Sequence, residues 1–550
     1  MSDPEVRSLA EAKKQNYLHG AAILAAGVVV LKILGAIYKI PLRNIIGETG
    51  YGYFFAAYTI YNFFLTISTA GLPVALSRMI SEASTLDRPR QARRTFRVAT
   101  GTLGVLGLVF SLLMFLFPTE MAVAFVSKAT VSQCVFAISP AVLLVCLTSA
   151  FRGYIQGNGN MTPTTVGQIL EVLVKVVVGL ALAIWFTRMG KSVPESAAGA
   201  IFGVSVGSLA VLIYMAASYF RQYRSPAAAA CAASDDVPDS IGKTLWQFIR
   251  IGVPITLGAS VMSLFSLIDT KLINMQLPHV AGIGPKLADE LYGAYSTMQT
   301  LYNLPAAFIT PMSIAVVPAI SAAAVRRARK EVGSITESSL RISAVIALPM
   351  GAGLAVLAQP IVAMLFPDSN VAGPTILAYM GVASVFVCIA LVTNAILQAD
   401  GREALPIISM LVGGVVKIAC NLLLVSRPEI NILGAAIGTI VCYAVICVLN
   451  CFFIAKYMAV QMRYGRSFLP PLLSTLVMAA CAWAVYGIAG RVLHVGPGGS
   501  RLMMLIALAA AIIVAVVVYL VMVIVTRSVT MEDMKLIPKG EKIAKLLHIK

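Results

Sequence analysis

The chain has few charged residues and lacks the motifs of soluble catalytic sites. Charged residues make up 12% of its 550 residues, against about 25% in typical soluble domains. The nine cysteines form no Cys-x-x-Cys pair, and there is no P-loop and no His-Glu-x-x-His motif. We therefore expect no metal site, no cofactor and no enzymatic activity. The four histidines are far apart and have no metal-ligand spacing: His19, His279, His494 and His548.

Apolar sequence dominates the chain instead. Hydrophobic residues make up 59% of it, and the mean hydropathy is +0.87. Apolar runs of about 20 residues recur, which is the length that crosses a bilayer as a helix. The sequence therefore predicts an all-α polytopic membrane protein with fourteen transmembrane helices. Their expected ranges are 18–41, 51–77, 96–118, 130–152, 164–187, 196–220, 244–270, 290–320, 337–365, 374–398, 405–426, 431–456, 467–490 and 502–526.

The longest interior connector, 221–243, is rich in Ala, Ser, Asp and Pro, which is typical of a linker. It lies between the sixth and seventh predicted helices. The prediction is a lobe of six helices before the linker, a second lobe of six after it, and two further helices. The expected divisions are a tail at 1–17, lobes at 18–220 and 244–456, helices at 467–526 and a tail at 527–550.

Lysine and arginine indicate how the helices are oriented. With the N-terminus in the cytoplasm, 27 of the 42 basic residues fall on the cytoplasmic side, nine on the other side and six within the spans. Basic residues concentrate in cytoplasmic loops of membrane proteins. We therefore expect both termini in the cytoplasm and a location in a bacterial plasma membrane. This bias explains the net charge of +18 without a nucleic-acid partner.

A short motif recurs in the two predicted lobes. "YGYFFAAYTIYN" at 51–62 and "YGAYSTMQTLYN" at 292–303 are identical at five of twelve positions, at an offset of 241. The two segments fall in the second and eighth predicted helices. Repeated halves are typical of transporters, whose substrate site lies between them. The sequence thus favours transport by alternating access.

Three basic residues lie along the first predicted helix. Lys32, Lys39 and Arg43 share one face at 100° per residue. A charge at the bilayer centre costs about 2.5–3.5 kcal/mol on insertion scales, so it usually faces a cavity or a partner. The stripe either lines a cavity that attracts an anion, or Lys39 and Arg43 extend to the lipid headgroups.

Two further lysines, Lys175 and Lys417, lie within predicted helices five and eleven. Lys175 shares a face with Gln168 and Glu171, and Glu171 is placed to pair with it at i, i+4. With Glu171 as the one acid at similar depth, these spans indicate a cationic cavity and a phosphate-bearing cargo. Other polar residues are expected to support the cavity: Asn62, Asp269, Gln299, Asn303 and Asn421.

Glycine and proline interrupt several predicted helices. Membrane helices tolerate such residues where neighbours or a cavity satisfy the freed backbone groups. We expect either the broken helices used in alternating access or ordinary kinks. The positions are Gly71, Pro73, Pro305, Pro311, Pro318, Pro349 and Gly351.

The residues "KILGAIYKIPLRNIIGETGYGYFFAAYTIYNFFLTISTAGLPVALSRMISE" (32–82) and "EDMKLIPKGEKIAKLL" (532–547) resemble the Gram-positive polysaccharide-exporter branch of the MATE/MOP flippases. This branch includes the stage V sporulation protein B-like and lipid II flippase-like proteins. The resemblance implies a V-shaped bundle around a cationic cavity. It implies export of an undecaprenyl-diphosphate-linked sugar precursor, with lipid II favoured. Lys32 matches a basic position that acts on the diphosphate, and Lys39 lies near it; Gln299 stands where related flippases carry a basic residue.

The resemblance also implies a mechanism and partners. The headgroup enters from the cytoplasmic side, Lys32, Lys39 and Arg43 counter the diphosphate, and the polyprenyl tail stays among the membrane lipids. No ATP site exists in the sequence, so the membrane potential or a coupling cation would supply the energy; no oligomer is required. Three alternatives remain: a flippase for a capsular, teichoic or exopolysaccharide precursor, a cation-coupled multidrug exporter, and a membrane glycosyltransferase.

Overall fold

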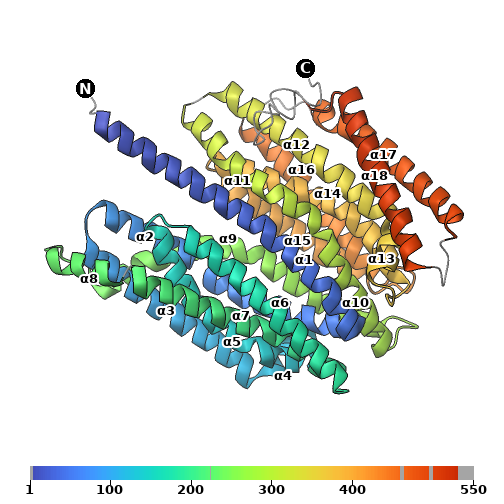
Figure 1. The fold of residues 1–550 in the computed structure, drawn as a ribbon, viewed down its shortest axis with the longest axis horizontal. Helices are drawn as coiled ribbons and strands as arrows, with labels where there is room; N and C mark the ends of the chain where they lie inside the picture. The colour runs from blue at the N-terminus through green and yellow to red at the C-terminus, as the bar shows by residue number, and fades with distance from the viewer. Residues whose placement is uncertain (1–3, 223, 327, 459–463, 495–499, 530–550) are drawn as a thin grey trace. The chain divides into compact units, whose positions relative to one another are not determined.

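The computed structural model describes residues 4–222, 224–326, 328–458, 464–494 and 500–529. Within these ranges, the side chains of 4–33, 36–37, 226–228, 230, 314–315, 464 and 466 lie outside the description. All regular secondary structure in the described ranges is helical (Figure 1). The all-α membrane fold predicted from hydropathy is confirmed.

The chain divides into two compact units, one ending at Asn274 and the other beginning at Met275. We call these unit 1 and unit 2. The helices of unit 1 are α1 (Pro4–Thr69), α2 (Leu72–Thr85), α3 (Pro89–Leu116), α4 (Pro118–Val126), α5 (Ser132–Gly157), α6 (Thr162–Arg188), α7 (Val193–Gln222), α8 (Arg224–Ala233) and α9 (Ile241–Gln276, whose last two residues belong to unit 2). Those of unit 2 are α10 (Pro285–Tyr302), α11 (Leu304–Val325), α12 (Arg329–Val356), α13 (Ala358–Leu365), α14 (Ala372–Ala399), α15 (Ala404–Leu424), α16 (Leu433–Tyr457), α17 (Tyr464–Val492) and α18 (Arg501–Val525).

Thirteen helical stretches of the described residues are long and apolar enough to span a membrane. They begin at Tyr38 and match the second to the fourteenth predicted helices, whereas most of the first predicted helix, 18–41, precedes Tyr38. Gly47 has φ 75° and ψ 175°, which is not helical, so α1 consists of two helices joined at this residue. Glycine adopts a positive φ without the steric penalty that a Cβ brings. The parts of α1 before and after Gly47 correspond to the first two predicted helices.

Two of the predicted interruptions are breaks in the chain of helices. α1 ends at Thr69 and α2 begins at Leu72, with Gly71 between them. The Gly71 N–H donates to Thr256 Oγ1 of α9 at 3.2 Å, which satisfies a backbone donor that the break frees. α10 and α11 are likewise separated by Asn303, two residues before Pro305. By contrast, α11 runs unbroken through Pro311 and Pro318, and α12 through Pro349.

The two units repeat one pattern of helix packing. In unit 1, α7 packs against α5 and α6, and α3 packs against α5; in unit 2, α16 packs against α14 and α15, and α12 against α14. The first residues of α12, α13, α14 and α16 follow those of α3, α4, α5 and α7 by 240 residues (329 against 89, 358 against 118, 372 against 132, 433 against 193). This agreement extends the repeat from one motif to whole helices.

The five identical residues of the repeated motif have the same burial in each unit. The Tyr-Gly pair at the start of the motif, the shared Thr and the Tyr before the final Asn are buried in both copies. The final Asn is exposed in both. Packing therefore accounts for four of the identities. The pairs are Tyr51 and Tyr292, Gly52 and Gly293, Thr59 and Thr300, Tyr61 and Tyr302, and Asn62 and Asn303.

A row of three glycines on α7 brings α6 close. Gly199, Gly203 and Gly207 repeat every four residues on one face, in a small-xxx-small pattern that allows helix backbones to approach in a membrane. A Cβ on Gly203 would lie 2.6 Å from the backbone of Gly179 and 2.9 Å from the Lys175 carbonyl oxygen of α6. A Cβ on Gly207 would lie 2.7 Å from the Glu171 carbonyl oxygen. The glycine row therefore fixes the position of α6, the helix that carries three candidate site residues, Gln168, Glu171 and Lys175.

The predicted linker contains a helix and is attached to α3. It holds the ten-residue α8, and the stretch after α8 turns back to α3. Asp236 accepts hydrogen bonds from the backbone N–H groups of Arg90 (3.1 Å) and Gln91 (3.0 Å), the second and third residues of α3. The residue before α3, Arg88, supplies no side-chain cap. Asp236 therefore caps α3 from a distant part of the chain.

The carboxylate of Asp236 has a lowered pKa. Partial desolvation opposes this shift, but hydrogen bonds from Ser234, Gln91 and Arg90 and the charge of Arg90 outweigh it.

The most compact division of the chain falls after Asn274, so α9 lies mainly in unit 1. The assignment of this helix to a second lobe beginning at residue 244 stays a prediction.

Substituting Asp236 with alanine should release the linker from α3. Removing an N-cap costs about 1 kcal/mol, and we expect faster tryptic cleavage at Arg224 and Lys243 with α3 otherwise intact. Because the pKa of Asp236 is lowered, its stabilising contribution is present above the ordinary carboxyl pKa of about 3.9 and is lost as the pH falls through the folded value. Cleavage of the wild type should therefore stay slow from pH 8 to pH 5.

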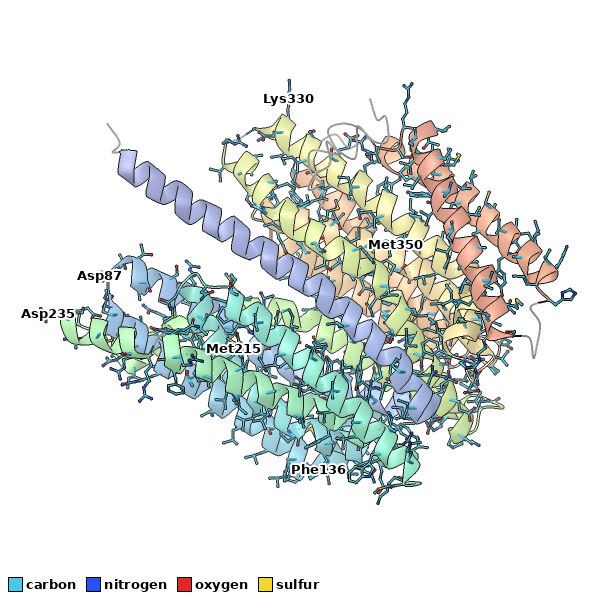
Figure 2. All side chains as sticks on the ribbon, in the orientation of Figure 1. Asp87, Phe136, Met215, Asp235, Lys330 and Met350 are labelled. Atoms are coloured by element: carbon cyan, nitrogen blue, oxygen red, sulfur yellow. The ribbon has the colours of Figure 1, made fainter. Side chains whose placement is uncertain are left out.

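Asp235 provides the matched control. It is exposed (Figure 2), and no hydrogen bond or ion pair of its side chain occurs within the described part of the chain. Asp235→Ala should be cleaved at the wild-type rate. Equal protection in both variants would show that the cap does not hold the linker.

Candidate functional site

Lys39 of α1 and Lys175 of α6 come together inside unit 1. α1 packs against α6, and Tyr38 places its hydroxyl oxygen 2.6 Å from where a Cβ on Gly179 would lie. The charges of the two lysines are close enough to repel each other. Both side chains are partly buried, and neither forms an ion pair within the residues that the structure describes. Two like charges held together in membrane-spanning helices are the arrangement that we expect at a site for an anion.

Glu171 does not neutralise this pair. It lies one turn before Lys175, yet no ion pair joins the two, so the expected i, i+4 pairing does not form in the described structure. Instead, Glu171 lies within electrostatic range of Arg152 of α5 and Tyr61 of α1. Spacing along the sequence does not identify Arg152 as a neighbour of Glu171. Only the fold, which sets α5 beside α1, identifies it.

Aromatic rings line the same part of α1. The Phe54 ring stacks on Tyr51 at 5.9 Å and on Tyr58 at 6.2 Å, and it meets Tyr38 edge to face at 6.4 Å. Tyr58 continues the row to Tyr61 at 5.6 Å. These rings hold the two parts of α1 together around Gly47 and give the lysine pair a rigid support.

Arg43 lies in a different environment from Lys39. Its side chain is 1% exposed and forms an ion pair with Glu48 at 3.3 Å, across the break at Gly47. A buried charge with a partner is already compensated, whereas an isolated one is costly. Arg43 is therefore better suited to stabilising the turn of α1 than to binding an anion. Its assignment to the diphosphate stays a prediction.

The remaining candidates of unit 1 are spread over three helices. Lys32 belongs to α1, but its side chain lies outside the described residues. Gln168 is partly buried on α6, two turns before Lys175. Asn62 is exposed on α1, and Asp269 is buried on α9.

In unit 2, Lys417 and Asn421 share a face of α15 as expected. Lys417 is partly buried and Asn421 is fully buried, with its Oδ1 3.0 Å from where a Cβ on Gly438 of α16 would lie. On α10, Gln299 is partly buried, and Asn303 donates to its carbonyl oxygen at 2.7 Å.

Lys175 and Lys417 occupy matching places in the two units. α15 begins 242 residues after α6 (404 against 162), and Lys417 follows Lys175 by the same 242 residues (417 against 175). The backbone carbonyl of each lysine also lies close to a glycine of the next helix. The Lys175 carbonyl oxygen is 2.9 Å from where a Cβ on Gly203 would lie, and the Lys417 carbonyl oxygen is 3.7 Å from where a Cβ on Gly438 would lie. The repeat thus places one lysine on the corresponding helix of each unit.

The part of the chain that the structure describes contains no set of side chains that could bind a metal ion. No group of three or more His, Cys, Asp or Glu side chains there could hold a metal ion. The nine cysteines are all free thiols. The chemistry that the lysine pair offers is reversible binding of an anion by point charges.

The chain is similar to a sporulation protein, a lipid II flippase and a multidrug resistance transporter. It is 25% identical over 465 residues to stage V sporulation protein B of Bacillus subtilis (strain 168), which covers 83% of this chain and 87% of that protein. The solved structure of the lipid II flippase MurJ in an inward closed conformation matches 92% of this chain and 99% of its own, with a TM-score of 0.67 and 14% identity. An inward-facing MATE family transporter of the MOP superfamily matches 77% of this chain and 98% of its own, with a TM-score of 0.63 and 16% identity.

These likenesses confirm the fold that the sequence resemblance implies, which is that of the MATE/MOP superfamily. The family model described as "Polysaccharide biosynthesis protein" matches residues 17–324, which is more than half of the chain. That range includes the helices that carry Lys39 and Lys175. The chain belongs to the polysaccharide biosynthesis protein family.

Proposed function

We propose that the protein is a flippase that moves an undecaprenyl-diphosphate-linked sugar precursor, lipid II, from the inner to the outer leaflet for peptidoglycan synthesis. The observation that carries this proposal is the pair Lys39 and Lys175, two cations without an ion-pair partner in the described part of unit 1. A diphosphate supplies the negative charge that would relieve their repulsion. The likeness to the lipid II flippase MurJ supports this cargo.

In the proposed cycle, the headgroup enters from the cytoplasmic side while the polyprenyl tail remains in the lipid. Lys39 and Lys175, with Lys32, hold the diphosphate, and Glu171 beside Arg152 limits the net charge around it. Lysine binds phosphate as a point charge rather than as a bidentate fork, which favours release after translocation. The membrane potential or a coupling cation resets the carrier by alternating access. The location is the bacterial plasma membrane, with both termini in the cytoplasm.

A flippase for another lipid-linked glycan, such as a teichoic or capsular precursor, is the second candidate. The family's description as polysaccharide biosynthesis supports it, and the lysine pair would serve any diphosphate-linked sugar. A multidrug exporter for organic cations fits less well, because the lysine pair would repel such a cargo.

Binding measurements on the purified protein test the cargo. Native mass spectrometry would compare lipid II, undecaprenyl phosphate and a lipid-linked teichoic precursor for the wild type and for Lys32→Ala. We expect lipid II to bind most tightly and Lys32→Ala to weaken it, because the lysine contributes to the charge opposite the diphosphate. Equal binding of the three lipids would remove lipid II as the cargo, and tighter binding of the teichoic precursor would favour the second candidate.

A further inference from the structure

A pocket of about 360 Å³ at the start of α3 is lined by four arginines. Arg90, Arg93, Arg94 and Arg97 are spaced i, i+3, i+4 and i+7, so they share one face of the helix. Cys231, Ala232 and Pro238 from the linker form the other wall. Among the described residues, no carboxylate lines this space, which we call the arginine pocket. Its location is separate from the lysine pair.

The four arginines divide into two pairs. Arg90 donates from Nε to the Cys231 carbonyl at 3.0 Å, and Arg94 donates to the Asp239 carbonyl at 2.7 Å, so these two hold the linker. Arg93 and Arg97 are exposed, and neither forms a hydrogen bond or an ion pair with any described residue. Their charges reach Tyr219 at the end of α7. Two guanidinium groups at the pocket therefore remain available for an external anion.

A pocket at the start of α12 in unit 2 differs from the arginine pocket in position and in lining. A pocket of about 330 Å³ lies at the start of α12 and is lined by Arg329, Asp400, Arg402 and Tyr457, among others. Arg402 pairs with Asp400 at 3.0 Å, and its guanidinium lies 5.1 Å from the centre of the Tyr457 ring. Two arginines and one carboxylate line this pocket, against four arginines in the arginine pocket. At the 240-residue offset of the repeat, the positions of the four arginines are occupied in unit 2 by Lys330, Gly333, Ser334 and Glu337, so unit 2 does not repeat this row of arginines.

The arginine pocket lies where a spanning helix meets the membrane surface. α3 is one of the candidate spans, and the arginines occupy its first three turns. The residues further along are apolar, and four of them are exposed as expected for contact with lipid tails. A molecule whose phosphate lies in the pocket would therefore have α3 beside its acyl chains. The four are Val105, Leu108, Val109 and Leu112.

We infer that the arginine pocket binds the phosphate group of an anionic phospholipid headgroup, with Arg93 and Arg97 as the phosphate ligands and Arg90 and Arg94 holding the linker over it. Arginine forks match phosphate oxygens bidentately. Basic pockets at the cytoplasmic surface of membrane helices are the places where anionic headgroups bind. The lipid would tie α3 and the linker to the bilayer surface.

The test is a titration of the purified full chain with phosphatidylglycerol, phosphatidylcholine and inorganic pyrophosphate, followed by native mass spectrometry and thermal unfolding. Arg93→Gln/Arg97→Gln should bind phosphatidylglycerol about tenfold more weakly than the wild type. Its melting temperature without lipid should be unchanged, because no described residue bonds to these side chains. Arg93→Lys/Arg97→Lys, which keeps the charge without the fork, should fall between the two. Phosphatidylcholine should not protect the wild type.

The matched control removes the same charge elsewhere. Arg78 of α2 and Lys330 at the start of α12 (Figure 2) are exposed and do not line the arginine pocket. Arg78→Gln/Lys330→Gln should keep wild-type affinity for phosphatidylglycerol. An equal loss in both double variants would overturn the inference, because the binding would then follow surface charge in general. Protection by pyrophosphate as strong as that by phosphatidylglycerol would overturn the lipid as the ligand. If the double glutamine variant does not fold, Arg97→Gln alone is compared with Arg78→Gln under the same criteria.

Discussion

Replacing Gly203 with valine should separate α7 from α6 and prevent the protein from accumulating in a folded form. A Cβ at this position would lie 2.6 Å from the Gly179 backbone and 2.9 Å from the Lys175 carbonyl, and backbone atoms cannot move aside as a flexible side chain does. Overpacking costs about 1–3 kcal/mol, occasionally more, so we expect about 3 kcal/mol or more for valine and less for alanine. Thermal unfolding in detergent, followed by size-exclusion chromatography, measures the effect.

Gly101 on α3 is the control for this substitution, because a Cβ there meets nothing within 4 Å. Gly101→Val should unfold close to the wild-type temperature. A Gly203→Val variant as stable as Gly101→Val would show that the glycine row does not determine the spacing of α6 and α7.

Removing Lys39 or Lys175 should weaken transport while leaving the empty protein at least as stable. A charged contact to a buried anion is worth about 2–5 kcal/mol, so either alanine variant should lose at least about 30-fold in affinity for the lipid-linked diphosphate. In the empty protein, however, the two cations repel each other and are partly desolvated. Loss of one charge should therefore raise the melting temperature or leave it unchanged.

Lys191 is the control for the lysine variants. It lies at the surface, with its side chain 49% exposed and paired with Glu195. Lys191→Ala should change neither binding nor stability, since exposed pairs contribute about 0–1 kcal/mol. A Lys39→Ala variant that keeps wild-type affinity, or loses affinity only in step with its melting temperature, would contradict the proposed role of the pair.

The spans of this fold could be predicted because burial in lipid imposes a length and a composition on each helix. The thirteen spans that begin at Tyr38 match the second to the fourteenth predicted helices, and most of the first predicted helix, 18–41, precedes Tyr38. The linker was harder to predict, since α8 and the cap by Asp236 depend on contacts with α3.

The candidate site could be predicted in part. Lysine within a span is conspicuous in a sequence, and two of the five predicted basic residues, Lys39 and Lys175, do meet. Their neighbours could not be identified by spacing. Arg152 reaches Glu171 from another helix, and Arg43 finds Glu48 across a turn that a helical wheel does not represent. The glycine row was visible as "GAIFGVSVG", but its partner on α6 was not.

The repeated helices give this chain a record of its own divergence. Unit 1 and unit 2 share one pattern of helix packing, so a comparison of equivalent positions shows which residues the packing requires and which can vary. The motif at 51–62 and its copy at 292–303 keep four buried identities, which indicates that shape was retained. The row of arginines at the start of α3 is not kept at the start of α12, where Lys330, Gly333, Ser334 and Glu337 occupy the equivalent positions. A duplicated ancestor that began with two equivalent halves would have specialised in this way, by keeping its packed positions and changing the charged residues at the start of one helix.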